Sequence, residues 1–142
     1  MKFEKLEDFY QVYESHRTYV HAEVRKKHIR NYDEQFWKPA DVKSNHSVLE
    51  LGAGTGLFLA YLEAKGITQF KGVDGDPKVL DYMPQSIAKK VTIGDIWEAL
   101  KDSKDRFDRI VMLDVFEHFS YLEGHKLLMA LKTHLVADGK IV

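Results

Sequence analysis

Three glycines at every second position, Gly52, Gly54 and Gly56, stand between two apolar segments. The run 47–51 has the composition of a buried strand, and the segment 57–62 that of the start of a helix. Glycine lets the backbone turn sharply and leaves no side chain between the main chain and a ligand. The first N–H groups of the helix can bind a carboxylate or a phosphate. This stretch therefore predicts a site for a nucleotide-like ligand.

Four acidic residues accompany this turn at positions where they could hold such a ligand. Glu50 lies two residues before the first glycine, and Asp74 ends the next apolar run, about 20 residues further on, where a ribose-binding carboxylate is expected. Asp95 and Asp114 end two later apolar runs. Because parallel strands bind ligands outside their carboxyl ends, these acids are expected to share one edge of the sheet.

An alternation of strands and helices is predicted from residue 47 onward, which implies right-handed crossovers and a parallel sheet. We expect strands at about 47–51, 69–73, 90–93 and 107–113, with a fifth beginning at Lys140 after a turn at Asp138-Gly139. Helices are expected at 57–65, from an Asp76 cap with an interruption at Pro84, at 96–102 and at 121–135. The last helix should bury Leu127, Leu128, Leu131 and Leu135.

Residues 1–45 are predicted to form a helical cap, and residues 46–142 the ligand-binding domain. Helical spacing predicts a first amphipathic helix through Phe3, Leu6, Tyr10 and Tyr13. A second helix is expected from about Arg17 to Phe36, ended by Pro39, with an inward face of Val20, Val24, Ile29, Tyr32 and Phe36.

Two features of this cap have a functional interpretation beside a structural one. One of Tyr10, Tyr13 and Tyr19 is a candidate for contact with cofactor or substrate, although most aromatic residues here should pack against the sheet. The basic run 25–30 is read first as a solvated helix face, and secondly as a site for an acidic substrate or nucleic acid.

The stretch Glu50-Leu51-Gly52-Ala53-Gly54-Thr55-Gly56 resembles the first motif of the class I S-adenosylmethionine (SAM) dependent methyltransferases. A dehydrogenase site usually reads G-x-G-x-x-G, whereas the third glycine here comes one residue earlier. Gly94-Asp95-Ile96 is similar to the adenine-binding turn of the same family. The resemblance covers about residues 46–142 and implies an α/β fold, a doubly wound parallel sheet of Rossmann-like type with strand order 3-2-1-4-5.

The resemblance also implies a role for each residue of the predicted site. Gly52, Ala53, Gly54 and Gly56 would pass under the methionine part of SAM, and Glu50 would support that loop or reach the ammonium through water. Asp74 would accept both ribose hydroxyls. The resemblance places Gly75 and Asp76 beside the adenine, with Asp95 accepting from the adenine amine and Ile96 packing on the adenine ring. Leu113 and Asp114 would face the ammonium or the sulfonium of SAM.

The segment after the fourth strand supplies the candidates for proton transfer. His118 is the candidate general base and Glu117 its neighbour, in an arrangement that resembles the small-molecule and ubiquinone-biosynthesis-like branch of the family. The structural alternative is a histidine that packs under the loop. Asp114, Glu117 and His118 with His125 or His134 could also hold a divalent ion, as in RNA 3′-terminal 2′-O-methyltransferases, but we predict no metal.

Composition excludes several other classes. The chain has 142 residues with 21 basic and 22 acidic side chains, which argues against nucleic acid or an anionic membrane as a partner. It has no cysteine and hence no disulfide or thiolate metal site. No apolar run approaches the roughly 18 residues of a membrane span, and the first residues lack a signal-peptide core, so we expect a cytoplasmic protein.

The sequence thus predicts a SAM-dependent methyltransferase acting on an oxygen or nitrogen of a small molecule. The alternatives are a non-catalytic SAM-fold module, an RNA 3′-end 2′-O-methyltransferase and a nicotinamide-dependent oxidoreductase. The family's sheet has seven strands, in the order 3-2-1-4-5-7-6, and the last of them are missing here. We therefore expect weak or no turnover, and an open sheet edge that an oligomer or a further C-terminal segment would complete.

Overall fold

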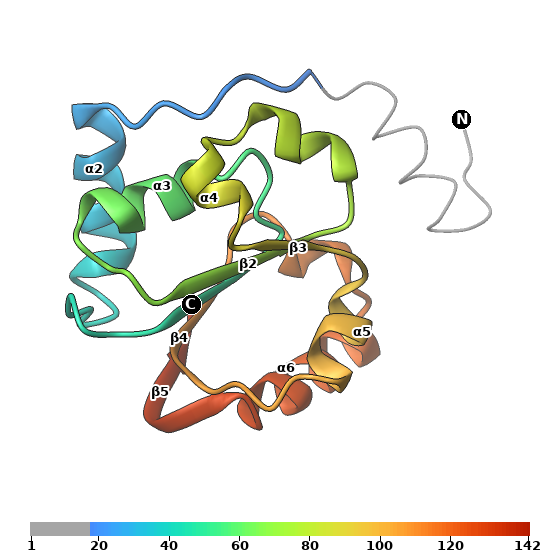
Figure 1. Cartoon of the computed structure of the whole chain (residues 1–142). Helices are drawn as coiled ribbons and strands as arrows, with labels where there is room; N and C mark the ends of the chain where they lie inside the picture. Colours follow the sequence, from blue (N-terminus) through green and yellow to red (C-terminus); the bar gives the residue numbers. More distant parts are fainter. Residues whose placement is uncertain (1–17) are drawn as a thin grey trace.

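A single parallel sheet forms the centre of the computed structural model, which describes residues 18–142 (Figure 1). Its strands lie in the order β3-β2-β1-β4-β5, and every neighbouring pair is parallel. Their bounds are β1 Val48–Leu51, β2 Phe70–Asp74, β3 Val91–Ile93, β4 Phe107–Met112 and β5 Leu135–Ile141. The order and direction of these strands confirm the predicted doubly wound fold.

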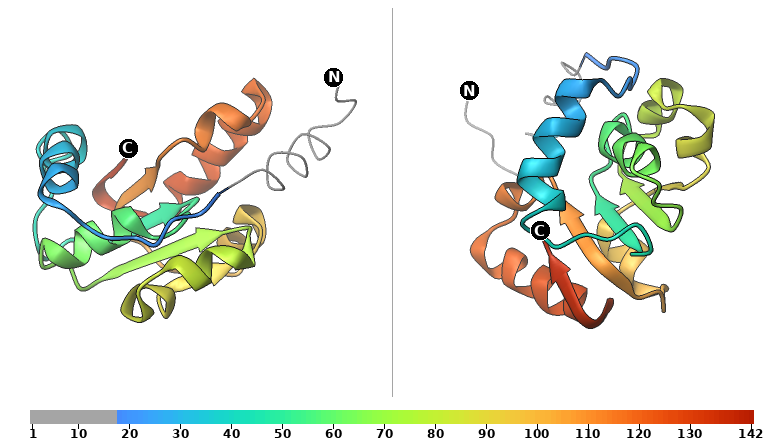
Figure 2. Two further views of the ribbon diagram at one scale, coloured as in Figure 1. Left: turned by 90° about the horizontal axis from the view of Figure 1, so that it is seen from above. Right: turned by 90° about the vertical axis from the view of Figure 1, so that its left-hand side faces the viewer.

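Helices cover both faces of this sheet (Figure 2). One face carries α3 (Leu57–Ala64), the 3-10 helix η2 (Pro77–Tyr82) and α4 (Gln85–Ala88), and the other carries α5 (Ile96–Lys101) and α6 (Tyr121–Lys132). The alternation of β1 separates the two cores, because Val48 packs with the first set of helices and Leu49 with the second. The side on which the crossovers run thus changes between β1 and β4, where ligands bind in folds of this kind.

Side-chain caps fix where several helices begin. Asp76 accepts a hydrogen bond from the backbone N–H of Lys78 and opens η2, with a proline as the first helical residue. Asp95 opens α5 in the same way, and Ser120 with Glu123 forms a capping box at the start of α6. Each of these helices therefore starts where the sequence predicts it.

The segment before the sheet differs from the predicted helix. Residues 18–25 have no helical structure, and the helix α2 begins only at Lys26 and runs to Tyr32, followed by a π-helix, η1, at Asp33–Trp37. We call residues 18–25 the strap, because this segment lies along η2 (Figure 1) with the Ala22 N–H donating to the Tyr82 carbonyl at 3.1 Å. Val20, expected to face inward, is 73% exposed. The predicted helix through Tyr10 and Tyr13 lies outside the described residues.

The end of the chain also departs from expectation. Helix α6 ends at Lys132, and β5 begins at Leu135 rather than at Lys140. Asp138 and Gly139 lie inside β5 at an irregularity where the register against β4 shifts. Leu127 and Leu131 are fully buried as predicted, but Leu128 is 38% exposed.

A buried arginine ties β4 to the chain that precedes β1. The Arg109 side chain is 4% exposed, and it donates hydrogen bonds to the carbonyl oxygens of Ala40, Asp41 and Asp108 at 2.7, 2.9 and 2.7 Å. Three carbonyl groups thus satisfy most donors of a guanidinium that has left water. This contact holds the turn after η1 against the sheet.

Candidate functional site

A cleft of about 700 Å³ lies at the carboxyl ends of the first four strands. We call it the strand-end cleft. Its walls contain eleven of the fourteen residues predicted for the site: Gly52, Gly54, Asp74, Gly75, Asp76, Asp95, Ile96, Leu113, Asp114, Glu117 and His118. Segments far apart in the sequence therefore meet in one hollow, as the sequence predicts for the ends of parallel strands.

The glycine loop forms the floor of this cleft between β1 and α3. Gly52, Gly54 and Gly56 all have positive φ, at 78°, 54° and 81°. A Cβ added to Gly52 would lie 2.3 Å from Cγ2 of Val115, and one added to Gly56 would lie 2.9 Å from Cγ2 of Ile87. The loop thus needs glycine both for its backbone conformation and for close packing.

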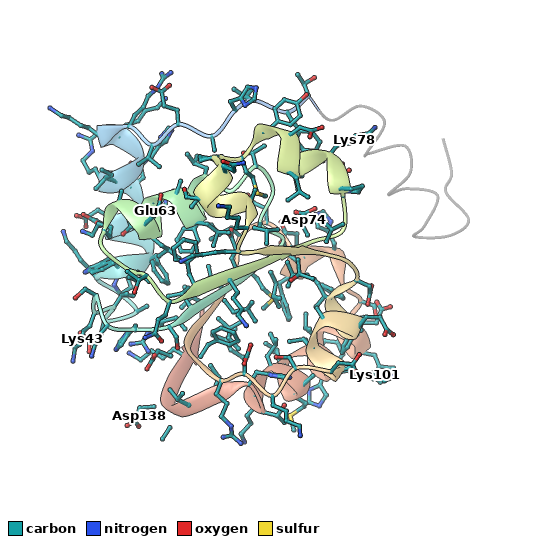
Figure 3. The ribbon with its side chains drawn as sticks, in the orientation of Figure 1. Lys43, Glu63, Asp74, Lys78, Lys101 and Asp138 are labelled. Atoms are coloured by element: carbon teal, nitrogen blue, oxygen red, sulfur yellow. The ribbon has the colours of Figure 1, made fainter. Side chains whose placement is uncertain are left out.

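The first acid after the loop is also a structural element of it. Asp74, at the end of β2 (Figure 3), is 7% exposed and accepts hydrogen bonds from the backbone N–H groups of Gly54 and Asp76, at 2.8 and 2.9 Å. A carboxylate has about four lone-pair positions, so two further donors can still bind. Asp74 is therefore fixed in place and still able to accept the two hydroxyls of a ribose.

Asp76 and Asp95 both cap helices and both line the cleft. Asp76 accepts from Lys78 N–H through Oδ1 and from the Tyr19 hydroxyl through Oδ2 at 2.5 Å. Asp95 accepts from the N–H of Trp97 at 2.8 Å through Oδ1. Asp76 thus caps η2 and lines the cleft, as the sequence predicts, and it also joins the strap to the cleft wall.

Three predicted residues do not line the cleft, namely Glu50, Ala53 and Gly56. Glu50 lies beneath it, 2% exposed, and its Oε2 has no hydrogen-bond partner among the described residues. Burial, and secondly the charge of Asp74, raise the pKa of this carboxyl well above its ordinary value. The side chain therefore favours its neutral form.

The loop after β4 supplies the other wall. Asp114 has φ of 54°, which is uncommon for a residue with a side chain. The 3-10 helix η3, Phe116–His118, follows and brings Glu117 and His118 to the cleft. Carboxylate oxygens and an imidazole thus lie where they could take a proton from a substrate.

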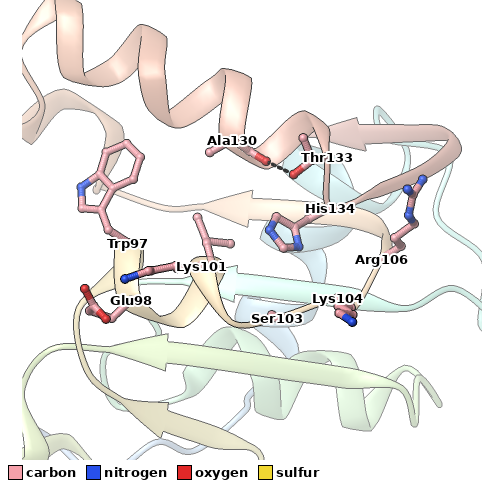
Figure 4. A pocket seen from close by; sticks show the side chains of 10 residues that line it. Trp97, Glu98, Lys101, Ser103, Lys104, Arg106, Ala130, Thr133 and His134 are labelled. Atoms are coloured by element: carbon pink, nitrogen blue, oxygen red, sulfur yellow. Dashed lines mark hydrogen bonds between the residues drawn. The ribbon is translucent and has the colours of Figure 1, made fainter.

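A metal site is not formed here. Within residues 18–142, no group of three or more histidine, aspartate or glutamate residues is placed to hold a metal ion. His134 lies in another hollow (Figure 4). Its Nδ1 is 3.0 Å from the Asp105 carbonyl oxygen. It therefore does not join Asp114, Glu117 and His118.

Two residues of the cleft were missed from the sequence, Val115 and Phe119. Val115 covers Gly52, and the Phe119 ring packs edge-on against Trp97 with centroids 6.5 Å apart. Their segment has neither strand nor long-helix periodicity, so only their proximity to Glu117 and His118 in sequence could have indicated them.

Between residues 18 and 142, no helix has the length and apolarity that crossing a bilayer requires.

Comparison with known proteins places the chain among methyltransferases. A curated relative, (S)-coclaurine N-methyltransferase from Thalictrum flavum subsp. glaucum, is 27% identical over 112 residues, which make up 75% of this chain and 30% of that protein. The solved structure of a SAM dependent methyltransferase from Archaeoglobus fulgidus matches with a TM-score of 0.68 at 22% identity, over 94% of this chain and 56% of that one.

A second structure, coclaurine N-methyltransferase bound to N-methylheliamine and SAH, matches with a TM-score of 0.64 at 18% identity, over 87% of this chain and 38% of that one. The chain thus spans less than two thirds of the length of these relatives. Residues 16–142 match the family described as a methyltransferase domain. The chain therefore belongs to the methyltransferase domain family, as its glycine motif predicts.

Proposed function

We propose that the strand-end cleft binds SAM and that the protein methylates an oxygen or a nitrogen of a small molecule. The observation that supports this most directly is the convergence of the glycine loop with Asp74 and Asp95 on one cleft of about 700 Å³. A volume of this size is within the roughly 300–1,000 Å³ of typical ligand sites.

The charge of the cleft suits this cofactor. Asp74, Asp76, Asp95, Asp114 and Glu117 are the carboxylates in its wall. SAM carries an ammonium and a sulfonium, and a cleft lined by carboxylates attracts these two cationic groups. The buried pair of oxygens on Asp74 suits the two adjacent hydroxyls of its ribose.

When bound, SAM supplies a methyl group on a leaving group that is already activated. The chain then needs to orient the acceptor, exclude water and take up a proton. We assign the last task to the imidazole of His118, with Glu117 beside it in the wall of the cleft. A curated relative named as an N-methyltransferase of coclaurine supports a small molecule as acceptor.

Calorimetric titration with S-adenosylhomocysteine (SAH) tests the cofactor. We expect SAH to bind and Asp74→Asn to weaken binding at least about tenfold, since hydrogen bonds to charged groups contribute about 1.5–3 kcal/mol. The control is Asp81→Asn, an exposed acid on η2 outside the cleft, which should leave the affinity unchanged. A folded wild-type chain that does not bind SAH contradicts the proposal.

Transfer of a labelled methyl group from SAM to a panel of phenols and amines tests the reaction. His118→Gln should lower turnover on any accepted compound while SAH affinity stays the same. A folded chain of normal stability whose melting temperature does not shift with SAH would favour the non-catalytic module. A change in NADH fluorescence on mixing, without SAH binding, would favour the oxidoreductase.

A further inference from the structure

A second hollow, next to the strand-end cleft, has no part in the function proposed above. It has a volume of about 660 Å³ and lies between the strap with the start of α2 on one side and the glycine loop on the other. We call it the basic hollow, because its wall contains His21, Arg25, Lys27 and His28. These residues include part of the basic run that the sequence left open between a solvated face and a binding site.

Neighbouring residues line the basic hollow and the strand-end cleft. Gly54 lines the cleft and the next residue, Thr55, lines the hollow. On the strap side, Tyr19 lines the hollow while its hydroxyl donates to Asp76, which lines the cleft. A ligand bound in the basic hollow would therefore lie next to a ligand bound in the strand-end cleft.

The two sites have opposite charge. The cleft has five carboxylates in its wall, whereas the hollow has one, Glu23, and this acid is paired with Arg25 at 3.1 Å. The whole chain has a formal charge of −1, so the basic character of the hollow is a local property and does not follow from the net charge. An anion is thus repelled by the cleft and attracted by the hollow.

The backbone adds to this preference. Leu57, in the wall of the hollow, is the first residue of α3, an eight-residue helix with no side-chain cap at Gly56. The N–H groups of a first helical turn and the helix dipole favour an anion. Lys27 can bind an anion as a point charge, and Arg25, whose Nη2 donates to Glu23, can bind one through its other N–H groups.

We infer that the basic hollow binds an anionic group, a carboxylate or a phosphate, carried by the methyl acceptor. This inference rests on the proposed function, because it assigns a substrate class to the same site. The anion anchors the acceptor outside the cleft, and the nucleophilic end of the acceptor reaches across the turn at Gly54 and Thr55 toward the methyl group.

Amide chemical shifts of the ¹⁵N-labelled chain measure binding of a simple anion. The protein is first saturated with SAH and then titrated at constant ionic strength with inorganic phosphate, and separately with acetate. We expect the Thr55 and Leu57 amide signals to shift in a saturable way with at least one of the two anions. The paired change Arg25→Gln and Lys27→Gln should raise the dissociation constant at least about fivefold.

A different pocket, which also has basic residues in its wall, provides the matched control. It lies between α5 and α6 and has Lys101, Lys104 and Arg106 in its wall (Figure 4). The paired change Lys101→Gln and Lys104→Gln removes the same charge and should leave the dissociation constant for the anion unchanged. The amide spectrum of each variant also reports whether the chain is still folded.

The remaining outcomes overturn the inference. Shifts that appear without SAH and vanish when SAH is bound would mean that the hollow holds the carboxylate of the cofactor. Equal weakening by both paired changes would mean non-specific attraction, and no shift with either anion would mean no site. Because SAH binding is measured first, a failure of the proposed function is distinguished from a failure of the anion site.

Discussion

Three glycines, Gly52, Gly66 and Gly75, differ in backbone conformation and in the space around them. Gly52 combines φ of 78° with the Val115 methyl group 2.3 Å from an added Cβ, whereas Gly66 has φ of 84° with nothing within 4 Å. Gly75 has open space and no positive φ. Backbone strain therefore acts alone at residue 66, and together with overlap at residue 52.

We predict from this that alanine at the three positions destabilises by different amounts. Gly75→Ala should change the free energy of unfolding by less than about 0.5 kcal/mol, and Gly66→Ala should lower it by about 1–2 kcal/mol. Gly52→Ala adds an overlap that costs about 1–3 kcal/mol more. Urea unfolding measures all three, and equal losses at residues 52 and 66 would show that Val115 yields without cost.

The buried carboxyl of Glu50 predicts a dependence of stability on pH. Burial raises the pKa of this group above its ordinary value of 4.5, so the folded state binds a proton that the unfolded state has released. The free energy of unfolding that Glu50 contributes therefore falls as the pH rises from about 4.5 toward the raised pKa of the folded state.

Glu50→Gln removes this titration and keeps the size of the side chain. The variant should become more stable relative to the wild type as the pH is raised from 5 to 8, in urea unfolding at several pH values. A difference between the two proteins that does not change with pH would mean that Glu50 is ionised in the folded state.

At the scale of elements, the contact between β4 and the turn after η1 depends on Arg109. Arg109→Met keeps the apolar stem but removes the donors to three carbonyl oxygens, two of them in the turn at Ala40 and Asp41. We expect a loss of about 2–4 kcal/mol in the free energy of unfolding. Arg106→Met, at an exposed position just before β4, should change it by less than about 0.5 kcal/mol.

The strap is the element that the sequence predicted least well. Its amphipathic spacing is compatible with a helix, but Tyr19 and His21 instead place their rings 5.4 and 5.1 Å from that of Tyr82. Tyr82 lies more than fifty residues away in the chain, so no local pattern contains this contact. By contrast, the first four strands and capped helices such as the one that Asp95 opens depend on neighbouring residues, and their starts were predicted within a few positions.

The residues of the candidate site likewise divide into those that the sequence predicts and those that it does not. The glycines and the acids at the strand ends follow from the order of the strands, which the alternation of apolar runs already indicates. The burial of Glu50 and the position of Val115 above Gly52 depend on how two loops pack together, and no spacing in the sequence encodes that.

For the whole molecule, one edge of the sheet predicts association. β5 is the last strand in the order, and α6 beside it exposes Leu122 and Met129, which are 61% and 54% accessible and seven residues apart on one helical face. Unpaired strand edges and apolar patches favour contact between chains.

We therefore expect the 142-residue chain to self-associate in a concentration-dependent way in sedimentation equilibrium. The paired change Leu122→Glu and Met129→Glu should weaken the association at least about tenfold, since burial of each large apolar side chain contributes about 1.5–3 kcal/mol. The control is Val20→Glu, on the exposed strap away from α6, which should leave the association unchanged. A wild-type chain that stays monomeric at high concentration would contradict this prediction.

Asp74 accepts backbone N–H groups from both the glycine loop and the start of η2, so folding itself orders the group that we assign to the ribose. The entropy of immobilising that acceptor is spent before any ligand arrives, which makes the site preorganised. Substitutions of this carboxylate will consequently be visible in a melting curve as well as in a binding isotherm. Ligand and scaffold use different lone pairs of the same two oxygens, so a change at Asp74 alters the stability of the fold and the affinity of the site together.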